Sequence, residues 1–341
     1  MRIAAVIVNY RTPDLVLRCL DALAKERRTF PDLRAVVADN SSGDGSAEKL
    51  SVALVQPAFA EWVEFLPLPL NGGFGWGNNQ AAIHLLGSDS PPDALYLLNP
   101  DTIIQPGALS ALVEEMVLRR DAGAIGSQLL NNDGTLSGSA FRFPSVAREF
   151  TRGLRIGAVE RLLLVKPMLV PYGLRQAVDW VTGASVLVRV SAIRTAGMFD
   201  TGFFLYFEEV ELMHRLKRHG WQTYHCPASR VMHIGGASTG VLGGRMSGNR
   251  PPPDYFFQSR HRYFALTGGR SRALLADVAW LTGSIFASGL RPFMPRRPVS
   301  DDHVERKALI RIGVGGRSLD ARPAISFPHD RPGEPPAWMS A

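Results

Sequence analysis

The chain has 341 residues, of which 45% are hydrophobic and 20% are charged, so it can fold around one large core with a smaller appendage. Its formal net charge of +7 favours an anionic partner, either a phosphorylated substrate or an acidic lipid surface. Neither a zinc finger nor an RNP-type aromatic strand occurs, so no nucleic-acid partner is expected.

Other bulk features favour a cytoplasmic protein. Cys19 and Cys226 are far apart and lack metal-ligand spacing, as expected of reduced thiols. The apolar run that begins at Ile3 is broken at Asn9, which is too short for a secretory signal. We find no window with the roughly 20 apolar residues of a membrane-spanning helix.

Strand and helix patterns alternate over the first part of the chain. The expected strands are 3–8, 34–38, 63–66 and 94–98, and the expected helices are 14–25, 81–86 and one that begins at Pro106. This alternation predicts an α/β doubly wound sheet, in which ligands bind beyond the carboxyl ends of the strands. Four polar residues stand at these ends, namely Asn9, Asp39, Asn71 and Asp101.

The second half of the chain is less regular. Residues 130–175 predict loops and short helices, and core strands are expected at 180–188 and 229–232. A helical pair is expected over 255–266 and 271–288. We therefore predict an α/β domain over 1–240, a helical extension over 241–290, and a proline-rich, disordered tail over 291–341.

The glycine-rich segment from Asn71 to Asn79 resembles a dinucleotide-binding fingerprint only superficially. Gly73-x-Gly75 is followed by Asn78 where the fingerprint needs glycine, and the segment follows the third strand rather than the first. A Rossmann dehydrogenase is therefore excluded.

Three further groups each have a structural and a functional interpretation. Asp39 and Asn40 suit an Asx-type turn, or a carboxylate that accepts a hydrogen bond from a pyrimidine base. Asp101 suits a turn, or a ligand for a hard divalent cation on a diphosphate. His233, before a glycine run, is either structural or a second ligand for that cation.

The segment from Phe199 to Trp221 is the most informative part of the sequence. Glu208, Glu209 and Glu211 directly follow an apolar and aromatic approach, where burial would disfavour their charges. They form either the acidic first turn of an amphipathic helix or a set of catalytic carboxylates.

Taken together and in this order, these segments resemble the family 2 glycosyltransferases with a GT-A fold, and most closely their rhamnosyltransferase-like branch, which builds bacterial cell-wall and surface polysaccharides. The resemblance covers about residues 3–240. The matching segments are Val8–Tyr10, Asp39–Ser42, Asn71–Asn79, Leu98–Asp101, Asp179–Ala184, Phe199–Arg215 and His233–Ser238.

The resemblance implies a mixed GT-A sheet flanked by helices, with a nucleotide-diphosphate sugar as donor and a glycan or lipid-linked acceptor. It implies that Glu209 is the general base, with Glu208 as the other candidate, and that Glu211 contacts the acceptor. The residues implied at the donor site are Tyr10, Asp39, Asn40, Gly73, Asn78 and Asn99. Asp101 and His233 would bind Mg²⁺ or Mn²⁺.

Two positions depart from the family pattern. Glu209 stands where the family usually has aspartate, and this leaves the base assignment open between Glu208 and Glu209. Asn99 replaces the first acidic residue of the metal motif. The chemistry needs a base that deprotonates the acceptor hydroxyl as it attacks the anomeric carbon, so inversion is expected, with L-rhamnose as one candidate sugar.

Two other functions compete with sugar transfer. One is a catalytically inactive module that binds a sugar nucleotide or a glycan. The other is a nucleotidyltransferase, which lacks support because no glycine-rich basic loop follows the first strand.

A possible membrane contact completes the sequence-based predictions. Leu274, Leu275, Val278, Leu281, Ile285 and Phe286 recur at helical spacing, and arginines flank them, including Arg270, Arg272 and Arg291. We predict either an ordinary core-packing helix or a helix that lies on an anionic membrane surface at the inner face of the cell membrane.

Overall fold

The computed structural model of the chain describes residues 1–173, 175–235, 241–242, 245–246, 252–290, 302–314, 324–325 and 333–339. The strands of its main sheet are β1 (Ile3–Asn9), β2 (Arg34–Asp39), β3 (Val63–Pro67), β4 (Ala94–Leu98), β5 (Thr102–Ile104), β6 (Ala122–Leu130), β8 (Gln176–Val178), β10 (Ser185–Arg189) and β11 (Gln222–His233). Their order is β3-β2-β1-β4-β10-β6-β11-β5, and β8 also pairs with β11. Two small ribbons pair β7 (Ala140–Phe141) with β9 (Trp180–Val181), and β12 (Val241–Leu242) with β13 (Arg245–Met246).

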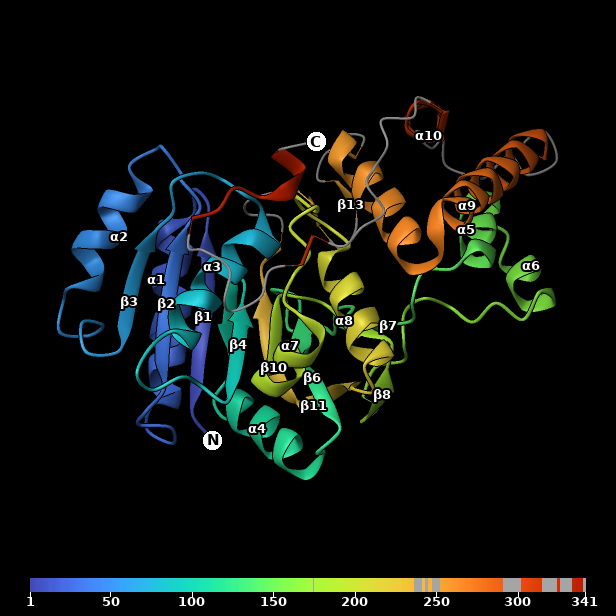
Figure 1. Ribbon diagram of the computed structural model, residues 1–341. Coiled ribbons are helices and arrows are strands. Elements are labelled where there is room, and N and C mark those ends of the chain that lie inside the picture. Colours follow the sequence, from blue (N-terminus) through green and yellow to red (C-terminus); the bar gives the residue numbers. More distant parts are fainter. Residues whose placement is uncertain are drawn as a thin grey trace.

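Helices cover both faces of this sheet, and a separate group of helices lies at one end of the molecule (Figure 1). The helices are α1 (Pro13–Glu26), α2 (Ser46–Leu54), α3 (Phe74–Leu86), α4 (Ala108–Leu118), α5 (Val146–Leu154), α6 (Gly157–Leu162), α7 (Val190–Ala196), α8 (Glu208–Arg218), α9 (Asp254–Gly289), α10 (Asp302–Val314) and a 3-10 turn (Ala337–Met339). The predicted α/β sheet with a helical extension is therefore confirmed.

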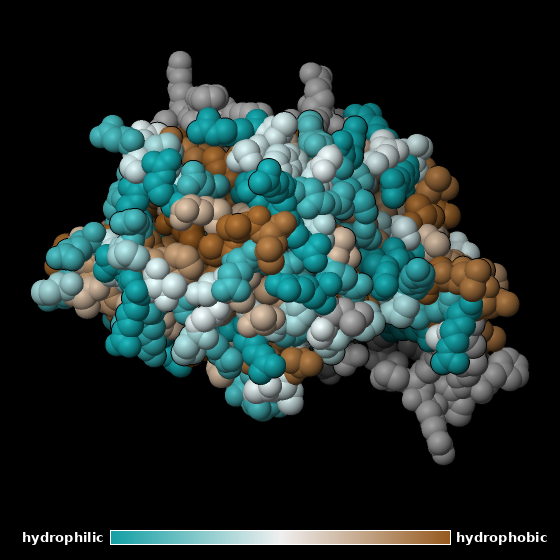
Figure 2. All heavy atoms as spheres, turned by 90° about the horizontal axis from the view of Figure 1, so that it is seen from below, coloured by the Kyte–Doolittle hydropathy of each residue, from teal (hydrophilic) through white to brown (hydrophobic). Residues whose placement is uncertain are grey.

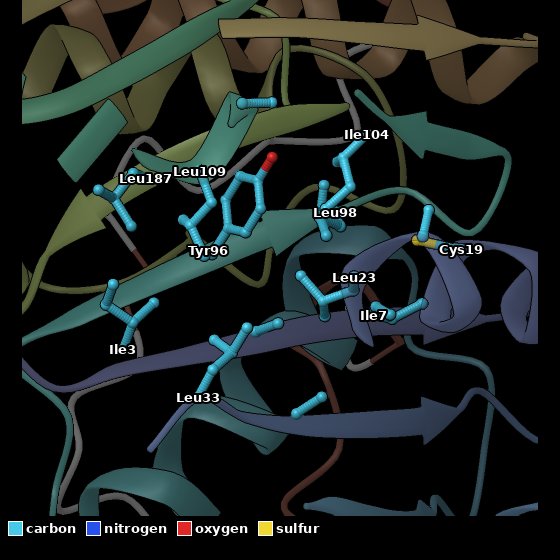
Figure 3. Packing of buried hydrophobic residues seen from close by; sticks show 14 of the residues in the cluster. Ile3, Ile7, Cys19, Leu23, Leu33, Tyr96, Leu98, Ile104, Leu109 and Leu187 are labelled. Atoms are coloured by element: carbon cyan, nitrogen blue, oxygen red, sulfur yellow. The ribbon is translucent and has the colours of Figure 1, made fainter. Parts of the chain in front are cut away.

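Side chains of β1 alternate between two hydrophobic cores, as the period of a strand requires. Ile3 and Ile7 pack with α1, α2 and α4 on one face, and Figure 3 shows this layer. Ala4 and Val8 pack with α3, α7 and α8 on the other face. Because both faces are covered, the whole strand is buried, which explains its unbroken apolar run.

Strand direction decides which loops meet at the functional edge. β1 pairs in parallel with β2 and β4, so their carboxyl ends lie side by side. β10 runs antiparallel to β4, with Ser185 opposite Leu98. The loop before β10 therefore lies at the same edge as the turn after β4.

The glycine-rich segment and the strand predicted over 180–188 differ from expectation. Most of the glycine segment is helical, because α3 begins at Phe74 directly after Gly73, whose φ of 90° suits a residue without a Cβ. The expected strand is divided into β9 and β10 by a turn at 182–184, and the two parts belong to different sheets. Similarly, α4 begins at Ala108 after Gly107, rather than at Pro106.

The helical pair and the tail are the other points of comparison. α9 is interrupted at Gly268 and Gly269, so the two predicted helices are present in one run. Within the tail predicted to be disordered, the structure describes α10, which packs on α9, and the segments 324–325 and 333–339, which pack on the predicted α/β domain. The domain boundaries at 240 and 290 stay predictions. Arg291, Gly236 and Ser238 lie outside the described residues.

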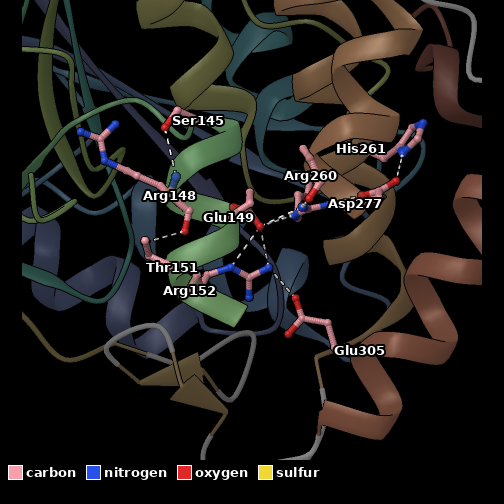
Figure 4. Close-up of polar contacts among 10 residues, drawn as sticks. Ser145, Arg148, Glu149, Thr151, Arg152, Arg260, His261, Asp277 and Glu305 are labelled. Carbon is pink, nitrogen blue, oxygen red and sulfur yellow. Dashed lines mark hydrogen bonds and ion pairs between the residues drawn. The ribbon is translucent and has the colours of Figure 1, made fainter. Parts of the chain in front are cut away.

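Buried ion pairs connect α5, α9 and α10 within the group of helices at one end of the molecule (Figure 4). Glu149 of α5 accepts hydrogen bonds from Arg152 and, at 2.8 Å, from Arg260 of α9. Arg260 also pairs with Asp277 in the second half of α9, and Arg152 reaches Glu305 of α10. Charges this deeply buried need such partners, so Asp277 is a packing residue of the helical extension.

Candidate active site

The nucleotide end of the predicted site is built where β1 and β2 end side by side. Asn9 pairs in register with Asp39, and its amide donates to Asp39 Oδ1 at 2.7 Å. Ser42 donates its hydroxyl to Oδ1 at 2.6 Å and its backbone N–H to Oδ2 at 3.0 Å. These bonds use three of about four acceptor positions of the carboxylate, so Asp39 retains one on Oδ2. Both predicted roles, turn residue and ligand acceptor, are therefore compatible.

Tyr10 directly follows Asn9 and is half-buried. The guanidinium of Arg11 lies 4.9 Å from the centre of the Tyr10 ring. Arg11 also donates from its backbone to Ser42 Oγ at 2.9 Å. These contacts place a ring and a cation beside Asp39, at the sheet edge where the sequence predicted the base site.

Asn40 connects this edge to the start of α3. Its amide donates to Gly73 O at 3.0 Å, whereas its Oδ1 is buried without a hydrogen-bond partner among the described residues. A Cβ at Gly77 would lie 2.8 Å from that Oδ1, so the glycine allows the helix to approach. The side-chain amide of Asn78 instead donates to Phe74 O, one turn earlier in the same helix, at 2.9 Å.

The predicted metal ligands meet because β11 and β5 run antiparallel. β11 ends opposite β5, with His233 paired to Thr102, and His233 Nε2 lies 3.2 Å from Asp101 Oδ1. In the same turn, the buried Oδ1 of Asn99 has no hydrogen-bond partner among the described residues. No cluster of three or more acidic, histidine or cysteine side chains suited to a metal occurs in the described part of the chain.

These residues nevertheless fit Mg²⁺ or Mn²⁺. Such ions are commonly bound by one or two carboxylates together with the phosphates of the substrate, rather than by a complete cage of protein ligands. Asp101 supplies the carboxylate, His233 a nitrogen, and a diphosphate would supply the remaining oxygens.

The turn that divides β9 from β10 joins the cation end to the carboxylates. Asn99 N donates to Ala184 O at 3.0 Å. A Cβ at Gly183 would lie 3.3 Å from the Phe74 ring and 3.8 Å from Glu209 Cβ, and one at Gly75 would lie 3.7 Å from Glu208 Cβ. The glycines thus permit close packing of this turn, the start of α3 and the start of α8.

Glu208 and Glu209 open α8 and are the least satisfied charges of the site. Glu208 is 3% exposed and Glu209 is half-buried, and each has an Oε2 that is buried without a hydrogen-bond partner among the described residues. Burial raises the pKa of Glu209 to about 7. Burial, together with the charge of Glu209, raises the pKa of Glu208 well above its usual range. Such shifts are typical of functional carboxyl groups.

Glu211 has a different environment. Its carboxylate accepts from Arg215 one helical turn later, at 3.0 Å from Nε and 2.7 Å from Nη2. Arg215 also donates to the backbone oxygens of Ala196 and Met198. This ion pair explains why Glu211 is buried, so the structure provides no support for a role at the acceptor, which stays a prediction. The four-residue spacing of Glu211 and Arg215 was visible in the sequence.

Asn79 is a residue of this region to which no role was assigned from the sequence. It exchanges two hydrogen bonds with the backbone of Phe199, at 2.8 Å and 3.0 Å, and so ties α3 to the segment that leads into α8. Its partner is 120 positions away, and no local pattern indicates that contact.

Comparison with known proteins identifies this arrangement. Residues 1–247 match the family described as Glycosyltransferase like family 2. The chain is 31% identical over 234 residues to N-acetylglucosaminyl-diphospho-decaprenol L-rhamnosyltransferase of Mycobacterium tuberculosis, covering 64% of this chain and 71% of that protein. It is 27% identical over 283 residues to galactofuranosyltransferase GlfT1 of the same species, covering 81% and 86%.

A solved structure agrees on the fold. GalNAc-T7, crystallised with UDP, GalNAc and Mn²⁺, superposes with a TM-score of 0.54 at 14% identity, covering 92% of this chain and 54% of that one. The family match covers the sheet and the residues assembled at its edge, and the predicted resemblance is confirmed. The chain therefore belongs to the glycosyltransferase-like family 2 and is a glycosyltransferase with a GT-A fold.

Proposed function

We propose that the protein is an inverting glycosyltransferase that moves a sugar from a nucleotide-diphosphate donor to a glycan or lipid-linked acceptor in cell-wall or surface polysaccharide synthesis. The observation that carries this proposal is the buried pair Glu208–Glu209, which packs against the start of α3 and the turn before β10. The names of the relatives, an L-rhamnosyltransferase and a galactofuranosyltransferase, support the choice of substrates.

Glu209 is the base in this mechanism. Glu209 is half-buried and so can meet an acceptor, whereas Glu208 is only 3% exposed. Burial raises the pKa of both carboxyl groups, and that of Glu209 rises to about 7. A base with a pKa near the working pH is well suited to proton transfer. Glu209 takes the proton of the acceptor hydroxyl as the oxygen forms its bond to the anomeric carbon. The bond from that carbon to the diphosphate breaks on the opposite side, so configuration inverts.

Other residues of the edge bind and orient the donor. Asp39 accepts a hydrogen bond from the nucleotide base at its remaining position. Asn40 offers its Oδ1, which has no hydrogen-bond partner among the described residues. Asp101 and His233 would hold a divalent cation, which neutralises charge on the departing diphosphate when it is bound. The amide of Asn78 donates within α3, so we assign this residue to positioning rather than to donor contact.

A panel of nucleotide sugars tests the proposal and narrows the donor. With Mn²⁺ present, the true donor should raise the midpoint of thermal unfolding, because a ligand that binds only the folded state stabilises it. We expect activated L-rhamnose or galactofuranose to give the largest shift, followed by transfer to a lipid-linked acceptor with inversion. Stabilisation without transfer or donor hydrolysis would instead support the inactive binding module.

The helical end of the molecule is the surface that would meet a lipid-linked acceptor. In Figure 2, hydrophobic surface gathers at the end where Figure 1 shows α6 and the second half of α9. The exposed apolar side chains there are Leu162, Leu163, Leu164, Leu274, Leu275, Val278, Ile285 and Phe286. Leu281 instead packs partly into the core. Exposed Arg161 and Lys166 flank the leucines 162–164 at the end of α6, which favours an anionic lipid surface.

This surface lies on a membrane rather than within it. None of the helices in the described ranges has both the length and the apolarity to cross a bilayer. Apolar side chains beside cations suit a helix that lies in the lipid interface. We propose that this surface meets the inner face of the cell membrane, as the sequence predicted for one of its two alternatives.

Vesicle sedimentation tests the membrane contact. The intact protein should sediment with vesicles that contain phosphatidylglycerol, and added salt should reduce the bound fraction because the attraction is partly electrostatic. Leu275→Glu combined with Ile285→Glu should abolish binding. Val52→Glu, at an equally exposed position on α2 at the opposite end of the molecule, is the matched control.

Point variants are needed because deletion of α9 would remove the buried Tyr263 and Phe264. Failure of the intact protein to bind at low salt would contradict the contact.

A further inference from the structure

The loop that leads into α8 has an unfavourable backbone. Tyr206 and Phe207 have φ angles of 69° and 67°, and neither is glycine. Side chains disfavour this left-handed region, and residues held there need support from the surrounding structure. Because Glu208 and Glu209 follow directly, whatever holds this loop also determines where the two carboxylates lie.

The C-terminal strap, which we define as residues 324–325 and 333–339, makes contact with the beginning of that loop. Thr201 donates its backbone N–H to Ala324 O at 2.8 Å. In return it accepts from Trp338 N at 3.3 Å and, on its hydroxyl, from Ala337 N at 3.4 Å. The ring of Trp338 packs edge-to-face on that of Phe204, with centroids 4.9 Å apart.

The same strap is fixed to the start of α3. Trp338 Nε1 donates to Gly72 O at 2.9 Å. Trp76 Nε1 donates to Glu334 O at 2.7 Å, and Gly333 N donates to Gln80 Oε1 at 2.7 Å. Trp338 therefore joins two segments that belong to the active site, the glycine turn before α3 and the loop before α8.

These two segments also contact each other directly. Phe74 N donates to Phe204 O at 3.2 Å, and a Cβ at Gly73 would lie only 1.9 Å from that oxygen. A second tether comes from α9, where Ser259 donates to Leu205 O at 2.8 Å. The loop consequently keeps some support without the strap, so removal of Trp338 should loosen it without unfolding the protein.

We infer that the C-terminal strap is a positioning element for sugar transfer, in which Trp338 holds the loop before α8 against the glycine turn before α3 so that Glu208 and Glu209 meet the acceptor. Trp338 acts through the loop and is not itself a catalytic residue. The inference rests on the proposed function for its kinetic consequence. Its structural consequence, ordering of the loop, is measurable without any substrate.

Variants of the full-length chain at Trp338 test this inference. Trp338→Ala should lower kcat about tenfold or more, since small misplacement of a catalytic group is costly, while the Kd of the donor changes less than about threefold. Trp338→Phe keeps a ring for the contact with Phe204 and loses the hydrogen bond to Gly72, so it should recover most of the activity. Met339→Ala, at a half-exposed neighbour, should behave like the wild type.

Amide hydrogen exchange of the substrate-free protein is the second measurement. In Trp338→Ala, exchange of residues 200–209 should accelerate while exchange in β1 and β4 stays unchanged. If the alanine variant does not fold, Trp338→Leu takes its place with the same expectation. Unchanged kcat and unchanged loop exchange would overturn the inference, as would equal loss of activity in the alanine and phenylalanine variants. A wild type without transfer activity would contradict the proposed function, and loop exchange would then decide the role of the strap alone.

Discussion

Replacing Glu209 with glutamine is expected to lower kcat by about 10²-fold or more, because the amide cannot accept the proton of the acceptor hydroxyl. Donor affinity should change little, since Glu209 packs beside Gly183. It lies neither at the end of the site that would bind the nucleotide base nor at the end that would bind the cation. Steady-state kinetics with saturating donor, together with a separate donor titration, measure the two effects.

The pH dependence of the wild type provides an independent check. Burial raises the pKa of Glu209 from 4.5 to about 7 in the substrate-free protein, so kcat/KM should rise with pH and reach half of its maximum near pH 7. Between these two values the folded protein retains a proton that the unfolded chain releases, so this group makes the protein less stable as pH rises. Glu209→Gln should therefore unfold at the same or a higher temperature than the wild type at pH 8, despite its loss of activity.

Glu208→Gln is the matched control for the assignment of the base. Glutamine keeps the size and polarity of Glu208 but cannot act as a base, so this variant should keep activity within about tenfold of the wild type if Glu209 is the base. The reverse pattern, in which Glu208→Gln is inactive and Glu209→Gln is active, would make Glu208 the base. A large loss of donor affinity in Glu209→Gln would assign that residue to binding.

Asp101→Ala is expected to weaken donor binding in Mn²⁺ by about 10²-fold or more, because a bound cation contributes several kcal/mol to the stabilisation of diphosphate charge. The fold should persist, since Asp101 lies in a turn and its described side-chain partner is His233. Donor titrations with and without Mn²⁺ measure the effect. The wild type should lose affinity when the cation is removed, and the variant should not.

Two variants control for this interpretation. His233→Ala should weaken donor binding in the same direction but less, because it removes a neutral ligand and keeps the carboxylate. Asp133→Ala, in an exposed turn, should bind the donor normally. Activity that survives both Asp101→Ala and excess chelator would rule out the cation-dependent mechanism.

Local patterns in the sequence were sufficient for the sheet and for its polar edge. The buried apolar runs of β1, β2 and β4 and the helices between them require parallel strands, and parallel strands bring Asn9 and Asp39 together. From the residues alone His233 was one of two alternatives, a structural residue or a second cation ligand, and the family resemblance favoured the ligand. Its pairing with Asp101 depends on β11 running antiparallel to β5 more than 100 residues later, which no local pattern indicates.

The sequence by itself determined the class of the protein, since periodicity and the order of its motifs specify the sheet, the family and the carboxylates that begin α8. Tertiary structure decided how those carboxylates differ, although the four-residue spacing of Glu211 and Arg215 is visible in the sequence. Glu211 is neutralised by Arg215, whereas Glu208 and Glu209 are left without such a partner among the described residues, packed against glycines from distant segments. The same holds for Trp338, whose contacts with Gly72 and Phe204 join parts of the chain that no local pattern relates. The physical reason is that burial and strain depend on contacts across the fold, whereas sequence patterns report mainly on neighbours along the chain.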